Sequence, residues 1–177
     1  MHLADLSTPA ALVDLDRFER NCRHMAERAH RLGVRLRPHV KTHKCVEAAR
    51  IQVRGHFGGI TVSTLAEARG FAGAGFRDIT YAVPIAPQKV ATALEIGASI
   101  DRLAVIVDHG EAITAVEEAA RSHGSVVPVW LKIDCGLHRA GVDPESRYAV
   151  ALAGRLAGSK RIDFSGVLTH AGQSYRA

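Results

Sequence analysis

The ten residues RLRPHVKTHK, from Arg35 to Lys44, contain two lysines, two histidines and two arginines. Like charges repel each other, and lysine is among the residues least often buried in proteins. A like charge about 5 Å from a lysine, at an effective dielectric of about 20, costs roughly 3 kcal/mol, or about two pKa units. An amine that is uncharged near neutral pH is a nucleophile that can form a Schiff base with a carbonyl and then carry a proton. The stretch therefore predicts a reactive lysine.

Backbone geometry selects Lys41 over Lys44 as this lysine. Pro38 disfavours a helix, so we interpret the segment as a strand that runs into a loop, with alternate residues on one face. That face carries Arg37, His39, Lys41 and, at the end of the strand, His43. Leu36 and Val40 point the other way, towards a covering helix, whereas Lys44 falls in the following loop or the next helix.

Two other interpretations compete for the same stretch. One is that the stretch is a solvated basic loop, and this alternative remains open. The other is a metal site built from His39 and His43, but the spacing HxxxH suits zinc only on a helix. On a strand with a rise of about 3.3 Å per residue, the two histidines stand about 13 Å apart and cannot share an ion.

The elements that must position these residues can be predicted from hydrophobic periodicity. From Asp16 to Leu32 an apolar stripe predicts an amphipathic helix, and Gly33 is its expected C-terminal cap. The stripe consists of Phe18, Cys22, Met25, Ala29 and Leu32.

After this helix, short β-branched runs alternate six times with helical patterns. The runs are VRLRPHV, GGITVST, DITYAV, RLAVIVD, VPVWLKID and DFSGVLT. Most are apolar on successive residues, which predicts parallel strands covered by helices, in a doubly wound sheet or a (β/α)8 barrel. Both architectures place their chemistry at the C-terminal ends of the strands.

Polar residues end these runs: Lys41, Ser63 with Thr64, Pro84, Asp108 with His109, Asp134, and His170. Turns are polar in any protein, so each of these residues except Lys41 has an ordinary alternative role. Asp134, which precedes Cys135 and Gly136, could be a simple turn former.

Composition excludes several classes of protein. The chain is 47% hydrophobic and 23% charged, which indicates one globular domain or part of one. We expect neither a membrane span nor a secretory leader, and three scattered cysteines predict reduced thiols, so the expected location is the cytoplasm. The formal charge of +5 comes with only 5% aromatic residues, which disfavours a nucleic-acid partner.

The stretch GFAGAGFRD, around Gly73 and Gly75, has the glycine content of a phosphate loop. It follows a helical pattern and precedes a strand, which is the reverse of the order that such a loop requires. We interpret it as the C-terminal cap of a helix.

Five motifs together resemble a known family. TPAALVDLDRFERN, RLRPHVKTHK, GITVSTLAEARGFAGAGFRDI, KIDCGLHRAGV and GVLTHAGQSY are similar, in this order, to the N-terminal half of eukaryotic-type D-serine dehydratases. Relatives of these enzymes include D-threonine aldolases and, more distantly, alanine racemases. The resemblance implies a fold-type III pyridoxal phosphate enzyme on a (β/α)8 barrel, with about six of the eight βα units present.

The same resemblance implies roles for particular residues. Lys41 would form the Schiff base with the cofactor, and Arg139 and His170 would contact the cofactor or substrate. His39 and Tyr175 would be further pocket residues near the cofactor. Alanine racemases carry a tyrosine four residues after their lysine, whereas this chain has Cys45, which weakens the racemase alternative.

The implied function is a lyase acting on a β-hydroxy D-amino acid, with a dehydratase giving a 2-oxo acid and ammonia. D-threonine aldolase-type cleavage and racemisation are alternatives, and a non-catalytic pyridoxal phosphate carrier is an alternative from another class. An unrelated α/β domain with a solvated basic loop would bind no cofactor.

The resemblance also makes residues 1–177 the N-terminal part of the barrel, without its last strands, the phosphate-binding loop and the C-terminal β-domain. A divalent zinc or manganese ion is expected to bind through those C-terminal residues, so no metal ligand is assigned in this chain. The intact protein is expected to be a homodimer, with no membrane partner.

Overall fold

The structure, a computed structural model, describes residues 2–176 and contains one parallel five-stranded sheet. Each strand pairs with the next one along the chain, so the spatial order is β1-β2-β3-β4-β5. The strands are β1 (Ile60–Val62), β2 (Asp78–Pro84), β3 (Arg102–Val107), β4 (Val127–Lys132) and β5 (Ile162–Leu168). An uninterrupted order is that of a barrel, because a doubly wound sheet reverses its strand order at a switch point. The predicted α/β class and partial barrel are therefore confirmed.

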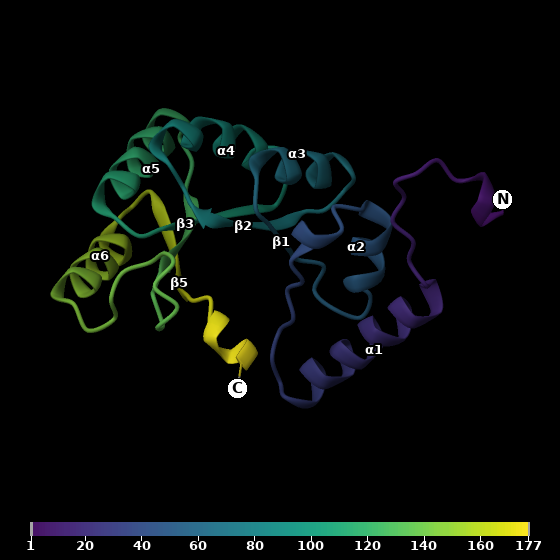
Figure 1. Ribbon diagram of the computed structural model, residues 1–177. Helices are drawn as coiled ribbons and strands as arrows, with labels where there is room; N and C mark the ends of the chain where they lie inside the picture. The colour runs from purple at the N-terminus through teal and green to yellow at the C-terminus, as the bar shows by residue number, and fades with distance from the viewer. Residues whose placement is uncertain (1, 177) are drawn as a thin grey trace.

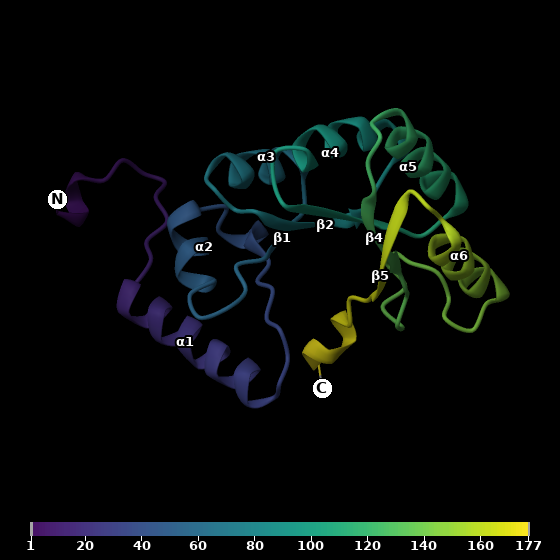
Figure 2. The same ribbon diagram turned by 180° about the vertical axis from the view of Figure 1, so that it is seen from behind.

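Helices connect the strands and cover the outer, convex side of the curved sheet (Figures 1 and 2). They are α3 (Leu65–Gly73), α4 (Val90–Gly97), which follows the short 3-10 turn η3 (Pro87–Lys89), α5 (Gly110–Ser122) and α6 (Arg147–Gly158). The expected helix cap at the end of α3 is confirmed, because Gly75 follows the helix with φ +93°. None of the helices within residues 2–176 is long and apolar enough to cross a membrane.

The N-terminal helix agrees closely with its prediction. A short 3-10 turn, η1 (Leu3–Asp5), precedes α1 (Leu15–Arg31), which begins after Asp14, whose side chain accepts a hydrogen bond from the Arg17 N–H. Gly33 follows α1 with φ +63°, as expected for a C-terminal cap. The apolar stripe is only partly covered, because Met25 is 51% and Leu32 65% exposed.

The prediction of a first strand from Val34 to Val40 is wrong, except that one residue, His39, pairs with the sheet. His39 forms a single parallel bridge with Thr61, supported by a 2.8 Å bond from the Thr61 N–H to the Pro38 carbonyl. Pro38 has no N–H to continue a ladder. The chain then turns into the 3-10 turn η2 (Val40–Thr42) and the short helix α2 (Val46–Gln52), so the sheet has five strands instead of six.

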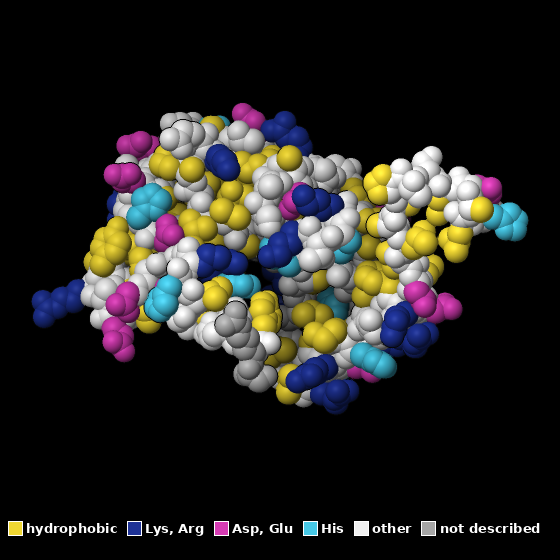
Figure 3. All heavy atoms as spheres, in the orientation of Figure 1, with side chains coloured by type: hydrophobic (Ala, Val, Ile, Leu, Met, Phe, Trp, Pro, Cys, Tyr) yellow, Lys and Arg dark blue, Asp and Glu magenta, His cyan; other side chains and the backbone are white. Residues whose placement is uncertain are grey.

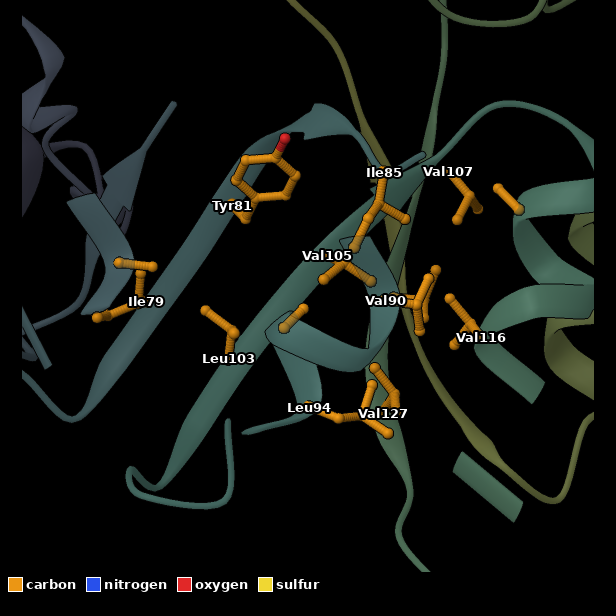
Figure 4. Close-up of a cluster of buried hydrophobic side chains, with 14 of the residues drawn as sticks. Ile79, Tyr81, Ile85, Val90, Leu94, Leu103, Val105, Val107, Val116 and Val127 are labelled. Atoms are coloured by element: carbon orange, nitrogen blue, oxygen red, sulfur yellow. The ribbon is translucent and has the colours of Figure 1, made fainter. Parts of the chain in front are cut away.

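The core lies between the sheet and the covering helices. Alternate residues of each strand face this layer, and Figure 4 shows Tyr81, Val105 and Val107 of the strands in one cluster with Val90 and Val116 of the helices. Burial of such side chains contributes about 1.5–3 kcal/mol each. The other residues of each strand face the concave side, among them Lys132. The core layer thus holds the strands in register and presents their C-terminal ends at one rim.

Candidate active site

Residues from three stretches of the chain meet at the C-terminal ends of the strands: the turn η2, the end of β4 with its following loop, and the segment after β5. The pKa of His170, which follows β5, is lowered by partial burial and then by the charges of Arg139, Lys132 and Lys41. The pKa of His39 is lowered by burial and then by Lys41, with a smaller effect from His170. On the face shown in Figure 3, Lys, Arg and His side chains gather around a hollow in the middle of the molecule. The structure therefore brings four of the predicted residues, Lys41, His39, Arg139 and His170, into one electrostatic neighbourhood.

Lys41 lies in the middle of η2, where its side chain is exposed at the rim. Its backbone N–H donates a 3.3 Å hydrogen bond to Nδ1 of His39, which caps the turn. Val40, next to it, is fully buried and anchors the turn in the core. Among the residues described, no carboxylate oxygen lies within ion-pair distance of the Lys41 amine. Lys44 differs in this respect, because its amine lies 3.2 Å from a Glu67 oxygen.

The other basic residues of the motif are engaged elsewhere. Arg37 binds the Asp78 carboxylate at 2.9 Å, at the N-terminal end of β2 and thus opposite the rim. The like charge that we expected Arg37 to place beside Lys41 is therefore compensated by Asp78, and that part of the prediction is wrong. His43 also leaves the predicted face, because its ring contacts Gln52 of α2 at 2.9 Å. The alternation of a strand ends where η2 begins.

The motif DCGLHRAG forms a closed loop after β4 that carries Arg139. The Asp134 carboxylate accepts 3.0 Å hydrogen bonds from the backbone N–H groups of Gly136 and His138, and these bonds hold its pKa below the usual value. The loop returns to β4 through a 2.9 Å bond from the Asp134 N–H to the Val142 carbonyl. Asp134 thus has the turn-forming role that was one of its two predicted alternatives. Arg139 is an exposed charged residue on this loop.

Gly141 closes this loop in a conformation that only glycine adopts easily. Its φ is +111°, and an added Cβ would come within 2.7 Å of the Asp134 nitrogen. We expect Gly141→Ala to lower the free energy of unfolding by about 1–3 kcal/mol, measured by urea denaturation. Gly154→Ala on α6 is the control: it meets no atom within 4 Å and should raise stability by roughly 0.5–1 kcal/mol. Equal changes in the free energy of unfolding for the two variants would contradict the explanation that the backbone conformation at Gly141 requires glycine.

Lys132, the last residue of β4, belongs to the same rim but was not predicted. It is only 5% exposed, and with Thr80 it is one of two buried polar or charged residues in the described part of the chain. Burial, followed by the charge of Arg139, lowers its pKa. The sequence signal that could have found it is a lysine placed directly after the apolar run VPVWL, at the end of a predicted strand.

The lowered pKa of Lys132 predicts a pH-dependent stability. The unfolded chain binds more protons than the folded one between this lowered pKa and the ordinary lysine value of about 10.4, so stability rises with pH across that window. We expect Lys132→Met, which removes the buried charge, to be more stable than the parent at neutral pH. Urea titrations at neutral and alkaline pH should show the difference shrinking as pH rises. A difference that stays constant with pH would contradict this explanation.

Tyr175 lies beside His170 but keeps an exposed ring. The two ring centroids are 6.0 Å apart in an edge-to-face arrangement, and Tyr175 in the short turn η4 (Gly172–Arg176) is 80% exposed. Its role as a pocket residue stays a prediction. Within residues 2–176, no three His, Cys, Asp or Glu side chains lie close enough together to hold a metal ion.

Comparison with known proteins gives consistent matches over nearly the whole chain. The model of the alanine racemase N-terminal domain matches residues 13–176. D-threo-3-hydroxyaspartate dehydratase from Delftia sp. (strain HT23) is 44% identical over 173 residues, which are 98% of this chain and 46% of that protein. D-serine dehydratase from Dictyostelium discoideum is 40% identical over 184 residues, 97% of this chain and 46% of that protein. The chain thus spans just under half the length of these relatives.

Solved structures show the same relationship. The Delftia enzyme superposes with a TM-score of 0.90 at 44% identity, covering 97% of this chain and 45% of that one. D-threonine aldolase from Filomicrobium marinum gives 0.84 at 34% identity, with 93% and 44% covered. An alanine racemase from Clostridium difficile 630, at 19% identity and a TM-score of 0.77 over 89% of this chain and 43% of that one, shares the fold. Because the family model matches residues 13–176 and the fold agrees with the solved relatives, the chain belongs to the alanine racemase N-terminal domain family.

Proposed function

We propose that this chain is the lysine-bearing part of a pyridoxal phosphate-dependent lyase that acts on a β-hydroxy D-amino acid. The observation that carries the proposal is the placement of Lys41, without a carboxylate partner among the described residues, at the same rim as Arg139, His170 and Lys132. Relatives named as dehydratases and aldolases of D-serine, D-threonine and 3-hydroxyaspartate support the substrate class.

The residues at the rim fit this cofactor chemically. Pyridoxal phosphate is an anionic aldehyde, so it needs an amine for its carbonyl carbon and positive charge for its anionic oxygens. Lys41 would supply the amine, and Arg139 with Lys132 would supply positive charge near it. When bound, the cofactor accepts the electron pair that is released at the substrate.

The chain's own groups then have defined tasks. The Lys41 amine would be the base that takes the proton from Cα of a dehydratase substrate. The lowered pKa values of His39 and His170 favour neutral imidazoles at neutral pH, so these rings add no further positive charge beside the amine. Arg139 stays charged and orients anionic groups at the rim.

The dehydratase reaction is our first choice within this class. The relatives at 44% and 40% identity are both named dehydratases, whereas the D-threonine aldolase from Arthrobacter sp is 33% identical. A variant of a D-threo-3-hydroxyaspartate dehydratase has been solved in a metal-free form. We propose that the complete protein uses a divalent ion, zinc or manganese, to help the β-hydroxyl leave.

The full-length protein, loaded with pyridoxal phosphate, tests the reaction directly. We expect ammonia release from D-serine or D-threo-3-hydroxyaspartate to exceed retro-aldol cleavage of D-threonine to glycine and acetaldehyde. Retro-aldol products alone would make the protein an aldolase. Tight cofactor binding without turnover of either substrate would instead indicate a carrier.

A further inference from the structure

Glu67 is a largely buried carboxylate that has no role in the proposed reaction. It lies in the first turn of α3, and its side chain is only 8% exposed. One carboxylate oxygen, Oε2, accepts a 2.8 Å hydrogen bond from the Ser63 N–H, and the other, Oε1, lies 3.2 Å from the Lys44 amine. Burial opposes ionisation, but these partners outweigh it and lower the pKa of Glu67, so the carboxylate is charged at neutral pH.

Helix capping accounts for only part of this arrangement. Thr64 caps α3 by accepting a 3.0 Å bond from the Glu67 N–H, and a glutamate at this position commonly binds a backbone N–H in return. The hydrogen bond that Glu67 Oε2 accepts from the Ser63 N–H is such a capping contact, and it uses one of the two carboxylate oxygens. The second oxygen reaches out of the helix to Lys44, in the segment that carries Lys41. The contact therefore links α3 to the turn η2.

Lys44 adopts a conformation that needs such support. Its φ is +49°, in the left-handed region, where residues with a Cβ are uncommon and cost about 1–3 kcal/mol. Its N–H donates a 2.9 Å bond to the Val40 carbonyl, which closes the segment around Lys41. The ion pair with Glu67 thus holds the C-terminal side of the Lys41 turn.

A second connection reaches the N-terminal side of the same turn. Ser63, whose N–H binds Glu67, has its hydroxyl 3.4 Å from Nε2 of His39. The other ring nitrogen, Nδ1, accepts the bond from the Lys41 N–H, which places the proton of the neutral ring on Nε2. His39 therefore donates to Ser63 and accepts from Lys41 at the same time.

We infer that Glu67 is a positioning residue that holds the Lys41 turn from both sides, through Lys44 on one and through Ser63 and His39 on the other. The consequence for chemistry rests on the proposed function: the turn delivers the Lys41 amine to the cofactor carbonyl in a fixed direction. A displacement of about 1 Å at a reacting group can cost on the order of 10²-fold in rate.

Two measurements on the full-length protein test this inference. The first is the rate at which pyridoxal phosphate becomes covalently attached to Lys41, followed by borohydride trapping and peptide mass. We expect Glu67→Gln and Lys44→Met each to slow attachment about tenfold or more. The double variant should be no slower than Glu67→Gln alone, because that variant already disrupts the contact with Lys44. Lys44→Arg keeps the positive charge and should recover most of the rate.

Glu95→Gln is the matched control. It makes the same chemical change at an exposed ion pair with Arg69, 3.8 Å long, between α3 and α4. We expect this variant to react at the parental rate and all variants to keep the parental secondary structure by circular dichroism. Parental rates for both Glu67→Gln and Lys44→Met would overturn the inference, as would an equal loss in Glu95→Gln.

The second measurement separates this inference from the proposed function. Amide hydrogen exchange at Lys41 and Lys44 needs no cofactor, and we expect at least tenfold faster exchange in Glu67→Gln but not in Glu95→Gln. If the parent attaches no cofactor while this contrast holds, the proposed function fails and the positioning role stands. Unchanged exchange in Glu67→Gln would overturn the positioning role itself.

Discussion

We expect Lys41→Ala to abolish covalent attachment of pyridoxal phosphate and to lower the proposed lyase activity of the full-length protein by at least about 10³-fold. Under the proposed function, the variant would remove both the amine that binds the cofactor carbonyl and the base that moves the substrate proton. No other lysine described at this rim is equivalent, because Lys44 is paired with Glu67 and Lys132 is buried at the end of β4. Borohydride reduction followed by peptide mass measures the attachment.

The matched control is Lys160→Ala. Lys160 is exposed and lies just before β5, at the N-terminal end of the sheet, opposite the rim. This variant should keep full attachment and full activity. Thermal unfolding should be nearly the same for Lys41→Ala and the parent, because the Lys41 side chain is exposed. A reduced cofactor adduct on another lysine of the parent, or undiminished attachment in Lys41→Ala, would refute the assignment.

We expect Arg139→Met to weaken binding of pyridoxal phosphate by about 10²-fold and to raise the pKa of His170. Arg139 provides positive charge at the rim, and a charge-assisted contact to an anion contributes roughly 1.5–3 kcal/mol. After partial burial, the charge of Arg139 is the largest influence that lowers the pKa of His170, so its removal moves that pKa towards the ordinary value of about 6.5. Cofactor titration measures the first effect, and NMR titration of the histidine ring measures the second.

The lowered pKa of His170 also determines how the stability of the folded chain changes with pH. Because the folded pKa of His170 is lowered, the unfolded chain binds more protons as pH falls through about 6.5, and the folded state loses stability in that window. Arg139→Met should reduce this acid sensitivity. Arg20→Met, a loss of charge on the exposed face of α1, should change neither the cofactor affinity nor the His170 titration. A His170 pKa that falls or stays constant in Arg139→Met would contradict the electrostatic explanation.

The crowding of cations in RLRPHVKTHK has a structural explanation that the motif alone does not provide. Arg35 stacks on the Phe57 ring at 3.9 Å, Arg37 binds Asp78, and Lys44 binds Glu67. Each of these partners comes from a different part of the fold. Only Lys41 and His39 of the six basic residues are directed to the rim that also carries Arg139 and His170.

The sequence by itself determined the features that depend on local physics. Hydrophobic periodicity located α1 and the helices between the strands. Turn chemistry identified the C-terminal end of α3 and offered a turn-forming role for Asp134 as one of two alternatives. Proline geometry and side-chain alternation on a predicted strand were the reasons for selecting Lys41. The structure places Lys41 at the C-terminal rim of the sheet, but in the 3-10 turn η2 and not on a strand face. These signals operate within a few residues of each other, so a single chain suffices to recognise them.

Only the tertiary structure decided which distant partner each charge would meet. Arg37 pairs with Asp78, 41 residues away, and Glu67 pairs with Lys44 across the gap between α3 and η2. The shortening of the first strand to one bridge and the burial of Lys132 depend likewise on strand register and on the helices that cover the sheet. Such pairings are set by how separate elements pack together, because proximity in the fold is not encoded in the spacing of any one motif.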